Sequence, residues 1–256
     1  MMDKVDILGV KIDTLHQDEL IAEICRDALD DVQSMIAHVN IRALNMSYEH
    51  AWLRRFFNNC DRVYCDGMGI SLAARLLGQS IPNRYTLADW IWPLVEMGFD
   101  HGLKFFLLGN PPGVAQRAAR NLRERFPDLN IEAQHGYFNK ISGAIENEVI
   151  LKHINNSHAN ILLVGFGMPT QEQWLNENRS RLNVNVVITC GALFEYISED
   201  LKRGPKWMTD HYLEWLSRIY ISPRRYAIRY LRDIPLFSYR VLTQRFRREA
   251  IIEHEL

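Results

Sequence analysis

The stretch YCDGMGISLAARLLG, residues 64–78, decides the fold of this chain. It begins as an apolar strand that ends at Cys65, continues with Asp66 and two nearby glycines, and runs on as a helix rich in Ala and Leu. A strand that leads directly into a helix is the repeating unit of parallel α/β sheets, which bind ligands at the carboxyl ends of their strands. Asp66 therefore has two interpretations: it caps the following helix, or it is a functional carboxylate.

The same alternation of strand and helix extends to about residue 200. Apolar segments rich in β-branched residues predict strands at 34–40, 62–65, 104–109, 129–136, 160–167 and 184–191. Segments of helical periodicity predict helices at 18–29, 111–126, 144–155 and 169–182. The pattern predicts an α/β fold with a mostly parallel, doubly wound sheet.

The pattern changes after Gly204 and Pro205, where the sequence becomes helical and basic. From 202 to 248 there are twelve Lys or Arg and three Asp or Glu, although the whole chain has a formal net charge of −1. We therefore predict an α/β domain over residues 1–201 and a helical appendage over residues 202–256. A basic end of this kind suggests an anionic partner: a membrane surface, a nucleic acid or a phosphorylated ligand.

Several classes of protein are disfavoured by what the sequence lacks. The four cysteines have neither CxxC nor disulfide-framework spacing, which indicates a reduced, cytosolic protein without a zinc site. No segment has the pattern of a signal peptide or the length of a membrane span. GxGxxG and GxxxxGK[ST] are absent, which disfavours nicotinamide-dependent enzymes and P-loop NTPases. There is no DxD pair, the arrangement that holds a metal ion against a diphosphate in many nucleotide-sugar transferases, and we predict no metal and no cofactor. A diphosphate leaving group would then have to be stabilised by arginines and backbone amides.

Glycines recur where the predicted strands end. They include Gly67, Gly109, Gly136, Gly167 and Gly191. Turns in α/β sheets use glycine for conformational reasons, but backbone N–H groups at such positions also approach phosphates closely. The set indicates a phosphate-bearing ligand at this edge of the sheet.

Motifs spread over nearly the whole chain carry a resemblance to a known family: CDGMGISLAARLLG, FFLLGNPPGVAQRAARNLRERFPDLNI, LLVGFGMPTQEQWL, CGALFEY, KRGPKWM and LEWLSRIYISPRRYAIRY. In this order and spacing they resemble the WecG/TagA/CpsF glycosyltransferases, glycosyltransferase family 26. The resemblance implies a Rossmann-like domain with a C-terminal appendage that meets the membrane and completes the active site. It implies an inverting, metal-independent enzyme that moves a hexose-type sugar from a UDP donor (UDP-glucose, UDP-ManNAc or UDP-ManNAcA) to a sugar on undecaprenyl diphosphate in cell-surface polysaccharide synthesis.

The resemblance also implies roles for individual residues. Asp66 matches the proposed general base, and Arg218 and Arg225 match arginines that reach back to the active site. The residues expected to bind substrate are His38, Asn40, Gly67, Arg84, Asp89, Gly109, Asn110, Tyr137, Gly167, Gln171, Glu195 and Arg229.

Some of these contacts have a more specific expected role. Gln171 is expected to bind a sugar or phosphate, Glu195 the ribose hydroxyls and Tyr137 the uracil. His38 stands where many family members have Thr, and three interpretations are open: a second acid/base group, a hydrogen-bond donor to the acceptor, or a satisfied histidine at a strand end. Thr170 replaces the usual Lys and Glu195 the more common Asp, so the motifs do not fix the donor sugar.

Two other functions fit the basic end of the chain: nucleic-acid binding, and nucleotide binding by a regulatory module without catalysis. Aromatic and aliphatic side chains between the arginines favour a membrane surface over nucleic acid. The arginines expected to face anionic lipid are Arg240, Arg245, Arg247 and Arg248. We expect a cytoplasmic protein that is peripheral on the inner face of the plasma membrane. Its first 200 residues are expected to fold by themselves. The sequence does not decide whether the protein is a homo-oligomer.

Overall fold

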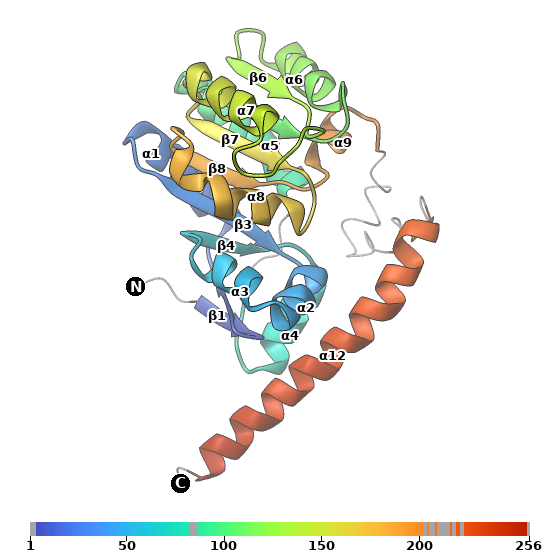
Figure 1. Cartoon of the computed structure of the whole chain (residues 1–256). Helices are drawn as coiled ribbons and strands as arrows, with labels where there is room; N and C mark the ends of the chain where they lie inside the picture. The colour runs from blue at the N-terminus through green and yellow to red at the C-terminus, as the bar shows by residue number, and fades with distance from the viewer. Residues whose placement is uncertain are drawn as a thin grey trace.

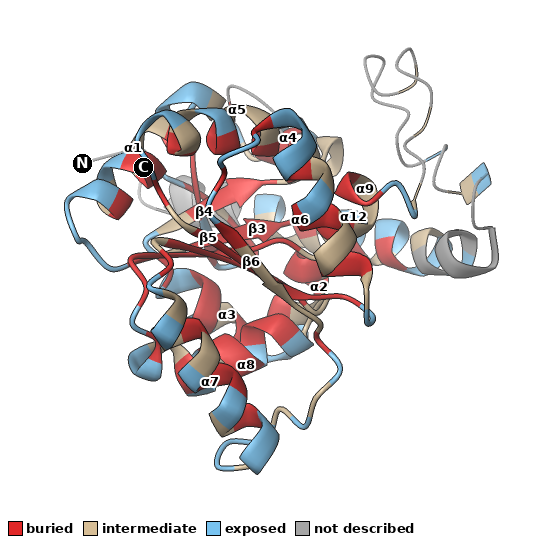
Figure 2. Ribbon diagram, turned by 90° about the horizontal axis from the view of Figure 1, so that it is seen from above, coloured by how far each residue is buried: buried red, intermediate tan, exposed pale blue. Residues whose placement is uncertain are grey.

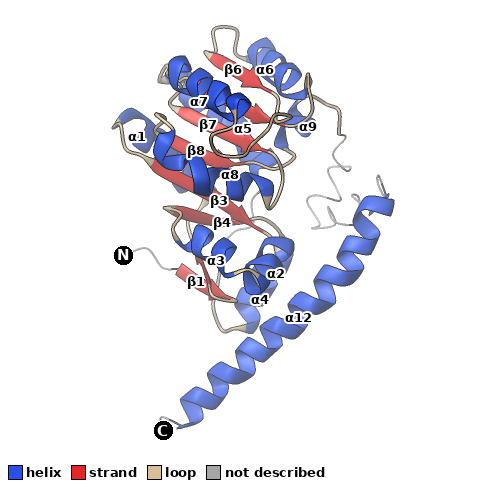
Figure 3. Ribbon diagram, viewed as in Figure 1, coloured by secondary structure: helices blue, strands red, loops and turns tan. Residues whose placement is uncertain are grey.

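The structure, a computed structural model, describes residues 4–81, 86–201, 204, 208, 216, 219, 220 and 223–254. Its central sheet is built from β3 (Ser34–Val39), β4 (Arg62–Cys65), β5 (Phe105–Gly109), β6 (Ile131–Gln134), β7 (Ile161–Gly165) and β8 (Val186–Thr189). These strands are all parallel and lie in the spatial order β4-β3-β8-β7-β5-β6 (Figure 3). Each of them falls within a predicted segment, and the parallel pairing confirms the predicted α/β fold.

Helices cover both faces of the sheet (Figures 1 and 2). One face carries α2 (Ile41–Glu49), α3 (Ala51–Asn58), α7 (Ile145–Ser157) and α8 (Thr170–Asn178). The other carries α1 (Gln17–Leu29), α5 (Leu87–Asp100), α6 (Val114–Arg125) and α9 (Leu193–Ile197). Every residue of β5, β7 and β8 is buried, which explains why these strands are continuously apolar rather than alternating.

The strand order determines where a ligand can bind. On one side β3 pairs with β4, which is the next strand of this sheet along the chain. On the other side β3 pairs with β8, which is the last strand. The chain therefore winds away from the β3–β8 pair in opposite directions. At such a topological switch point the loops after the strands separate and leave a crevice at the carboxyl edge of the sheet.

A β-hairpin that the sequence analysis did not include precedes the sheet. It pairs β1 (Lys4–Ile7) with β2 (Val10–Asp13) through a two-residue turn in which Leu8 and Gly9 have φ of 55° and 82°. Positive φ at both positions is typical of tight hairpin turns. The hairpin packs against β4 and α4 (Met68–Leu76) and extends the core beyond the edge of the sheet.

The described chain ends in a long helix, α12 (Pro223–His254), which runs along α2, α4 and the hairpin (Figure 1). Phe237 and Val241 are buried in the same apolar cluster as the hairpin and α2. The side chain of Gln244 accepts a hydrogen bond from the backbone N–H of Leu8 at 2.8 Å. α12 therefore contributes to this core, and the expectation that the first 200 residues fold by themselves stays a prediction.

Arg240 contributes to this docking. Its guanidinium donates hydrogen bonds to the carbonyl oxygen of Asn45 at 2.9 Å and to Oε1 of Glu49 at 2.8 Å, and it lies 4.5 Å from the ring centre of Tyr48. The prediction that Arg240 faces lipid is therefore wrong, because its side chain holds α12 against α2. Within the described part of the chain, no helix combines the length and the hydropathy of a membrane span.

Candidate active site

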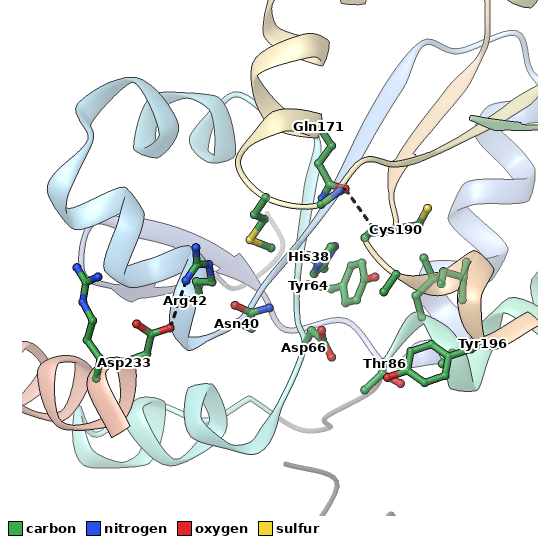
Figure 4. Close-up of a pocket in the computed structure, with 18 of the residues that line it drawn as sticks. His38, Asn40, Arg42, Tyr64, Asp66, Thr86, Gln171, Cys190, Tyr196 and Asp233 are labelled. Carbon is green, nitrogen blue, oxygen red and sulfur yellow. Dashed lines mark hydrogen bonds and ion pairs between the residues drawn. The ribbon is translucent and has the colours of Figure 1, made fainter. Parts of the chain in front are cut away.

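A cavity of about 600 Å³ lies at the carboxyl ends of β3, β4, β7 and β8, at the switch point of the sheet (Figure 4). We refer to it as the switch-point cavity. Of the predicted site residues, those that line it are His38, Asn40, Asp66, Gly167 and Gln171. They follow three different strands, so the fold brings together residues that are far apart in the sequence.

Asp66 follows β4 directly and lines the cavity. Its backbone N–H donates to the carbonyl oxygen of Val39 at 2.8 Å, which ties the end of β4 to the end of β3. The N-cap position of α4 belongs to Gly67, whose φ of 115° is rarely adopted by residues with a side chain. Asp66 is therefore not the N-cap residue, and the interpretation as a functional carboxylate is the one that the geometry favours.

The two glycines after Asp66 are required for different reasons. A Cβ atom added to Gly67 would meet no atom of the described residues within 4 Å, so among them only the backbone conformation, with its φ of 115°, calls for glycine there. A Cβ atom added to Gly69 would lie 2.4 Å from Cδ1 of Ile41, so this glycine lets α4 pack closely against α2. Gly67 itself does not line the cavity, and its predicted contact with a substrate stays a prediction.

His38 and Asn40 lie at the end of β3. Asn40 is the N-cap of α2, and its Oδ1 accepts a hydrogen bond from the backbone N–H of Ala43 at 3.0 Å. This bond uses one of the two lone pairs of Oδ1, so Asn40 can offer Nδ2 and the second lone pair of Oδ1 to a ligand. His38 is buried, and its Nδ1 lies 3.1 Å from the carbonyl oxygen of Thr189 on β8.

Gln171, in the first turn of α8, is completely buried and connects two strand ends. Its Oε1 accepts hydrogen bonds from the backbone N–H of Gly167 at 3.2 Å and of Gly191 at 3.1 Å. Its Nε2 donates to Oε1 of Glu172 at 2.8 Å. With both oxygen lone pairs and one N–H engaged, the amide fixes the loops after β7 and β8 and has one N–H left for a ligand.

Glu172 lies behind the cavity wall and is completely buried. Burial raises the pKa of its carboxyl group, and the hydrogen bond from Gln171 opposes this shift only in part. Its Oε2 has no hydrogen-bond partner in the described part of the chain. Burial therefore favours the protonated carboxyl of Glu172 more than exposure to solvent would.

The cavity has a cationic side where α2 meets α12. Arg42, in the first turn of α2, lies 3.8 Å from the carboxylate of Asp233 on α12, and Arg232 also lines the cavity. Figure 4 shows Arg42 on α2 beside Asp233 on α12. Two guanidinium groups at one end of a cavity suit a diphosphate.

Several lining residues were missed in the sequence: Arg42, Thr86, Tyr196, Arg232 and Asp233. The position of Arg42 could have been predicted from the sequence, because it lies two residues after Asn40 in the first turn of a helix that follows a strand end. The positions of Arg232 and Asp233 could not, because their place at the cavity depends on how α12 docks.

Other predicted residues lie away from the switch-point cavity. Asp89 accepts hydrogen bonds from the N–H and the hydroxyl of Thr86 and so caps α5. Asn110 donates to the carboxylate of Glu195 at 3.1 Å, and neither residue lines the cavity. Tyr137 is 68% exposed in the loop after β6.

Gly109, at the end of β5, is also outside the cavity. A Cβ atom there would lie 2.4 Å from the carbonyl oxygen of Gly165, so glycine is required by the close approach of β5 to β7. Contacts of Gly109, Asn110, Tyr137 and Glu195 with a nucleotide stay predictions. Arg84, Arg218 and the side chains of Arg225 and Arg229 lie outside the described residues.

The sequence of the whole chain was also compared with known proteins. Residues 5–251 match the model of the family described as "Glycosyl transferase WecG/TagA/CpsF family". A protein of Staphylococcus aureus strain COL is 26% identical over 240 residues, which cover 93% of this chain and 92% of the relative. A second, from strain MW2, is 25% identical over the same shares. Both are named N-acetylglucosaminyldiphosphoundecaprenol N-acetyl-beta-D-mannosaminyltransferase.

Proposed function

The chain belongs to the WecG/TagA/CpsF family of glycosyl transferases, and from this premise we propose that it moves a hexose-type sugar from a UDP donor to a sugar on undecaprenyl diphosphate. The relatives are named for the transfer of N-acetyl-β-D-mannosamine to N-acetylglucosaminyldiphosphoundecaprenol. UDP-N-acetylmannosamine is therefore the first donor to test, with UDP-glucose and UDP-N-acetylmannosaminuronic acid as alternatives.

The observation that carries the proposal is the position of Asp66. A carboxylate that is not the N-cap residue of its helix stands at the switch point of a parallel sheet, in a cavity that Asn40 also lines. This is where α/β sheets bind their ligands. A β product from an α-linked UDP donor requires attack on the face opposite UDP, and one base at the acceptor hydroxyl is enough for that step.

In this mechanism the carboxylate of Asp66 takes the proton of the acceptor hydroxyl. The hydroxyl oxygen forms a bond to the anomeric carbon while the bond from that carbon to UDP breaks, and UDP leaves with the electron pair. Negative charge grows on the diphosphate during this step, so fixed cationic donors near it accelerate the reaction.

Arginine side chains supply these donors in the proposed mechanism. Arg42 and Arg232 line the cavity at its α12 side. Arg218 and Arg225 are proposed to act in the same way, with Arg229 as a further contact. The proposed reaction uses no metal ion, and the donor screen described below tests this with EDTA.

We further propose that α12 rests on the inner face of the plasma membrane. Large apolar side chains are exposed on it at separations that place them on one helix face: Ile228, Leu231, Tyr239, Leu242 and Phe246. The opposite face, with Phe237 and Val241, is buried against the protein. Because Ile228 also lines the cavity, a lipid-bound α12 would bring the cavity to the headgroups, where a lipid-linked diphosphate lies.

The test of the transfer reaction is a donor screen. Each UDP-sugar is mixed with a short-chain lipid-diphosphate N-acetylglucosamine, and UDP release is followed with and without excess EDTA. We expect acceptor-dependent release from one donor, unchanged in EDTA. Turnover that stops in EDTA and returns with Mg²⁺ would contradict the metal-independent mechanism, and no turnover with any donor would contradict the function.

The membrane proposal has a separate test. Flotation with anionic vesicles should show binding that Leu231→Ser and Phe246→Ser weaken. Val149→Ser, which removes a similarly exposed apolar side chain from α7, serves as the matched control and should bind like the unmodified protein. Equal binding by all three variants would contradict a membrane-facing α12.

A further inference from the structure

His38 has a defined tautomer. Its Nδ1 lies 3.1 Å from the carbonyl oxygen of Thr189 and 3.2 Å from the hydroxyl oxygen of the same residue. A carbonyl oxygen can only accept a hydrogen bond, so Nδ1 must carry the hydrogen. In the neutral ring the other nitrogen, Nε2, then has a free lone pair and is an acceptor.

Nε2 has no protein partner, although the residue is buried. The hydrogen bonds of His38 are made by its backbone N–H and by Nδ1, all of them to Thr189, and no described residue bonds to Nε2. A Cβ atom added to Gly191, which lines the cavity, would lie 3.9 Å from Nε2. Figure 4 shows the ring between Gln171 and Asp66. The free lone pair is therefore available to a molecule in the switch-point cavity.

Although most of the residue is buried, Nε2 is not among the fully buried atoms that lack a partner in the described part of the chain, so this nitrogen is open to the cavity. At Nε2 the missing partner has to be a hydrogen-bond donor. Sugars carry hydroxyl groups that donate, whereas the phosphate oxygens of a nucleotide only accept. The ring nitrogen thus suits the sugar part of a substrate and not its diphosphate.

We propose that Nε2 of His38 accepts a hydrogen bond from a hydroxyl group of the sugar that is bound in the switch-point cavity, which makes His38 a catalytic residue that orients this sugar. The inference rests on the proposed function and names a contact within it. It also decides between the interpretations of His38 in the sequence: the neutral ring is an acceptor toward the substrate and not a donor.

Protonation of the ring would convert Nε2 into a donor and abolish the contact. The titratable groups that face His38 are Asp66 after β4, Tyr64 on β4, Cys190 after β8 and Glu172 on α8. Burial raises the pKa values of Cys190 and Glu172 and so favours the neutral form of both groups. Arg42, Arg232 and Asp233 lie across the cavity, on its α2 and α12 side.

Two variants separate the two ends of the ring. His38→Asn keeps a donor at the position of Nδ1, which can still bond to Thr189, but removes the acceptor at Nε2. His38→Gln places an amide oxygen near Nε2 and gives up the bond to Thr189. We expect kcat/KM for sugar transfer to fall about tenfold in the Asn variant, the size of one lost neutral hydrogen bond, and to recover largely in the Gln variant.

Melting temperatures complete the test. Recovery of turnover in the Gln variant, with its melting temperature at or below that of the Asn variant, supports the proposal. An Asn variant as active as the unmodified enzyme would show that His38 only ties β3 to β8. Equal loss in both variants would overturn the acceptor role as well, because the ring itself would then be required. If the unmodified enzyme transfers no sugar, both the proposed function and this inference fail. If the unmodified enzyme transfers sugar and the Asn variant has the same kcat/KM, only this inference fails.

Discussion

Replacing Gln171 by Leu should show that this residue positions two strand ends. The change keeps the size of the side chain and removes three hydrogen bonds: two from the backbone N–H groups of Gly167 and Gly191, and one to Glu172. A neutral hydrogen bond stabilises a protein by about 1 kcal/mol net, so the variant should lose about 3 kcal/mol of unfolding free energy. For a chain of this size that corresponds to a fall in melting temperature of about 6–12 °C.

The assay combines thermal unfolding with sugar transfer. Gln173→Leu is the matched control, since this glutamine is exposed on the same helix and bonds only to Glu177, and its loss should change stability by less than about 0.5 kcal/mol. A positioning role predicts that Gln171→Leu loses both stability and turnover. If Gln171 only contacted a sugar or phosphate, the variant would lose activity and melt like Gln173→Leu, and that result would refute the reasoning.

Asp66→Asn should lower turnover by about 10²- to 10⁴-fold in the transfer assay while UDP binding by calorimetry stays nearly unchanged; full activity would remove Asp66 from the role of base. Glu172→Gln should flatten the dependence of stability on pH. Burial raises the pKa of Glu172 above its unfolded value of 4.5, so the folded protein holds this proton more tightly than the unfolded chain does. The unfolding free energy therefore falls as the pH rises above about 4.5. Denaturant titrations in which the unfolding free energy of the variant depends on pH as steeply as that of the unmodified protein would contradict this. Arg240→Ala should cost about 2 kcal/mol of unfolding free energy, because the hydrogen bonds of Arg240 hold α12 on α2. Arg247→Ala should leave stability unchanged and weaken vesicle binding by about 1 kcal/mol. The reverse pattern would contradict the docking of α12.

Much of the fold could be predicted because the sheet is covered on both faces. A segment such as FFLLG at 105–109 has no polar residue to obscure its pattern, and its length rules out a core helix. The cavity residues that follow β3, β4 and β7 could be predicted for a related reason. The carboxyl ends of parallel strands meet at one edge, so residues there come together whatever their distance in sequence.

The rest depends on tertiary contacts. The buried face of α12 is visible as a helical pattern at Asp233, Phe237 and Val241, but nothing in that pattern says that its partner is α2 and the hairpin. The role of Gln171 depends on loops after two different strands, which the sequence cannot place against each other. Asp89 has a local role that the sequence analysis did not assign, because it accepts a hydrogen bond from the hydroxyl of Thr86 at the start of α5; its contact with a substrate stays a prediction.

The most direct measurement is the mass and anomeric configuration of the product that the enzyme forms from its best UDP donor and a lipid-diphosphate N-acetylglucosamine. We predict one added hexose-type residue per UDP released, joined to the acceptor sugar through a β linkage. A product with the α linkage would contradict inversion at the anomeric carbon. Release of UDP with free sugar and no enlarged lipid product would contradict the claim that the acceptor in the cavity is a lipid-linked sugar.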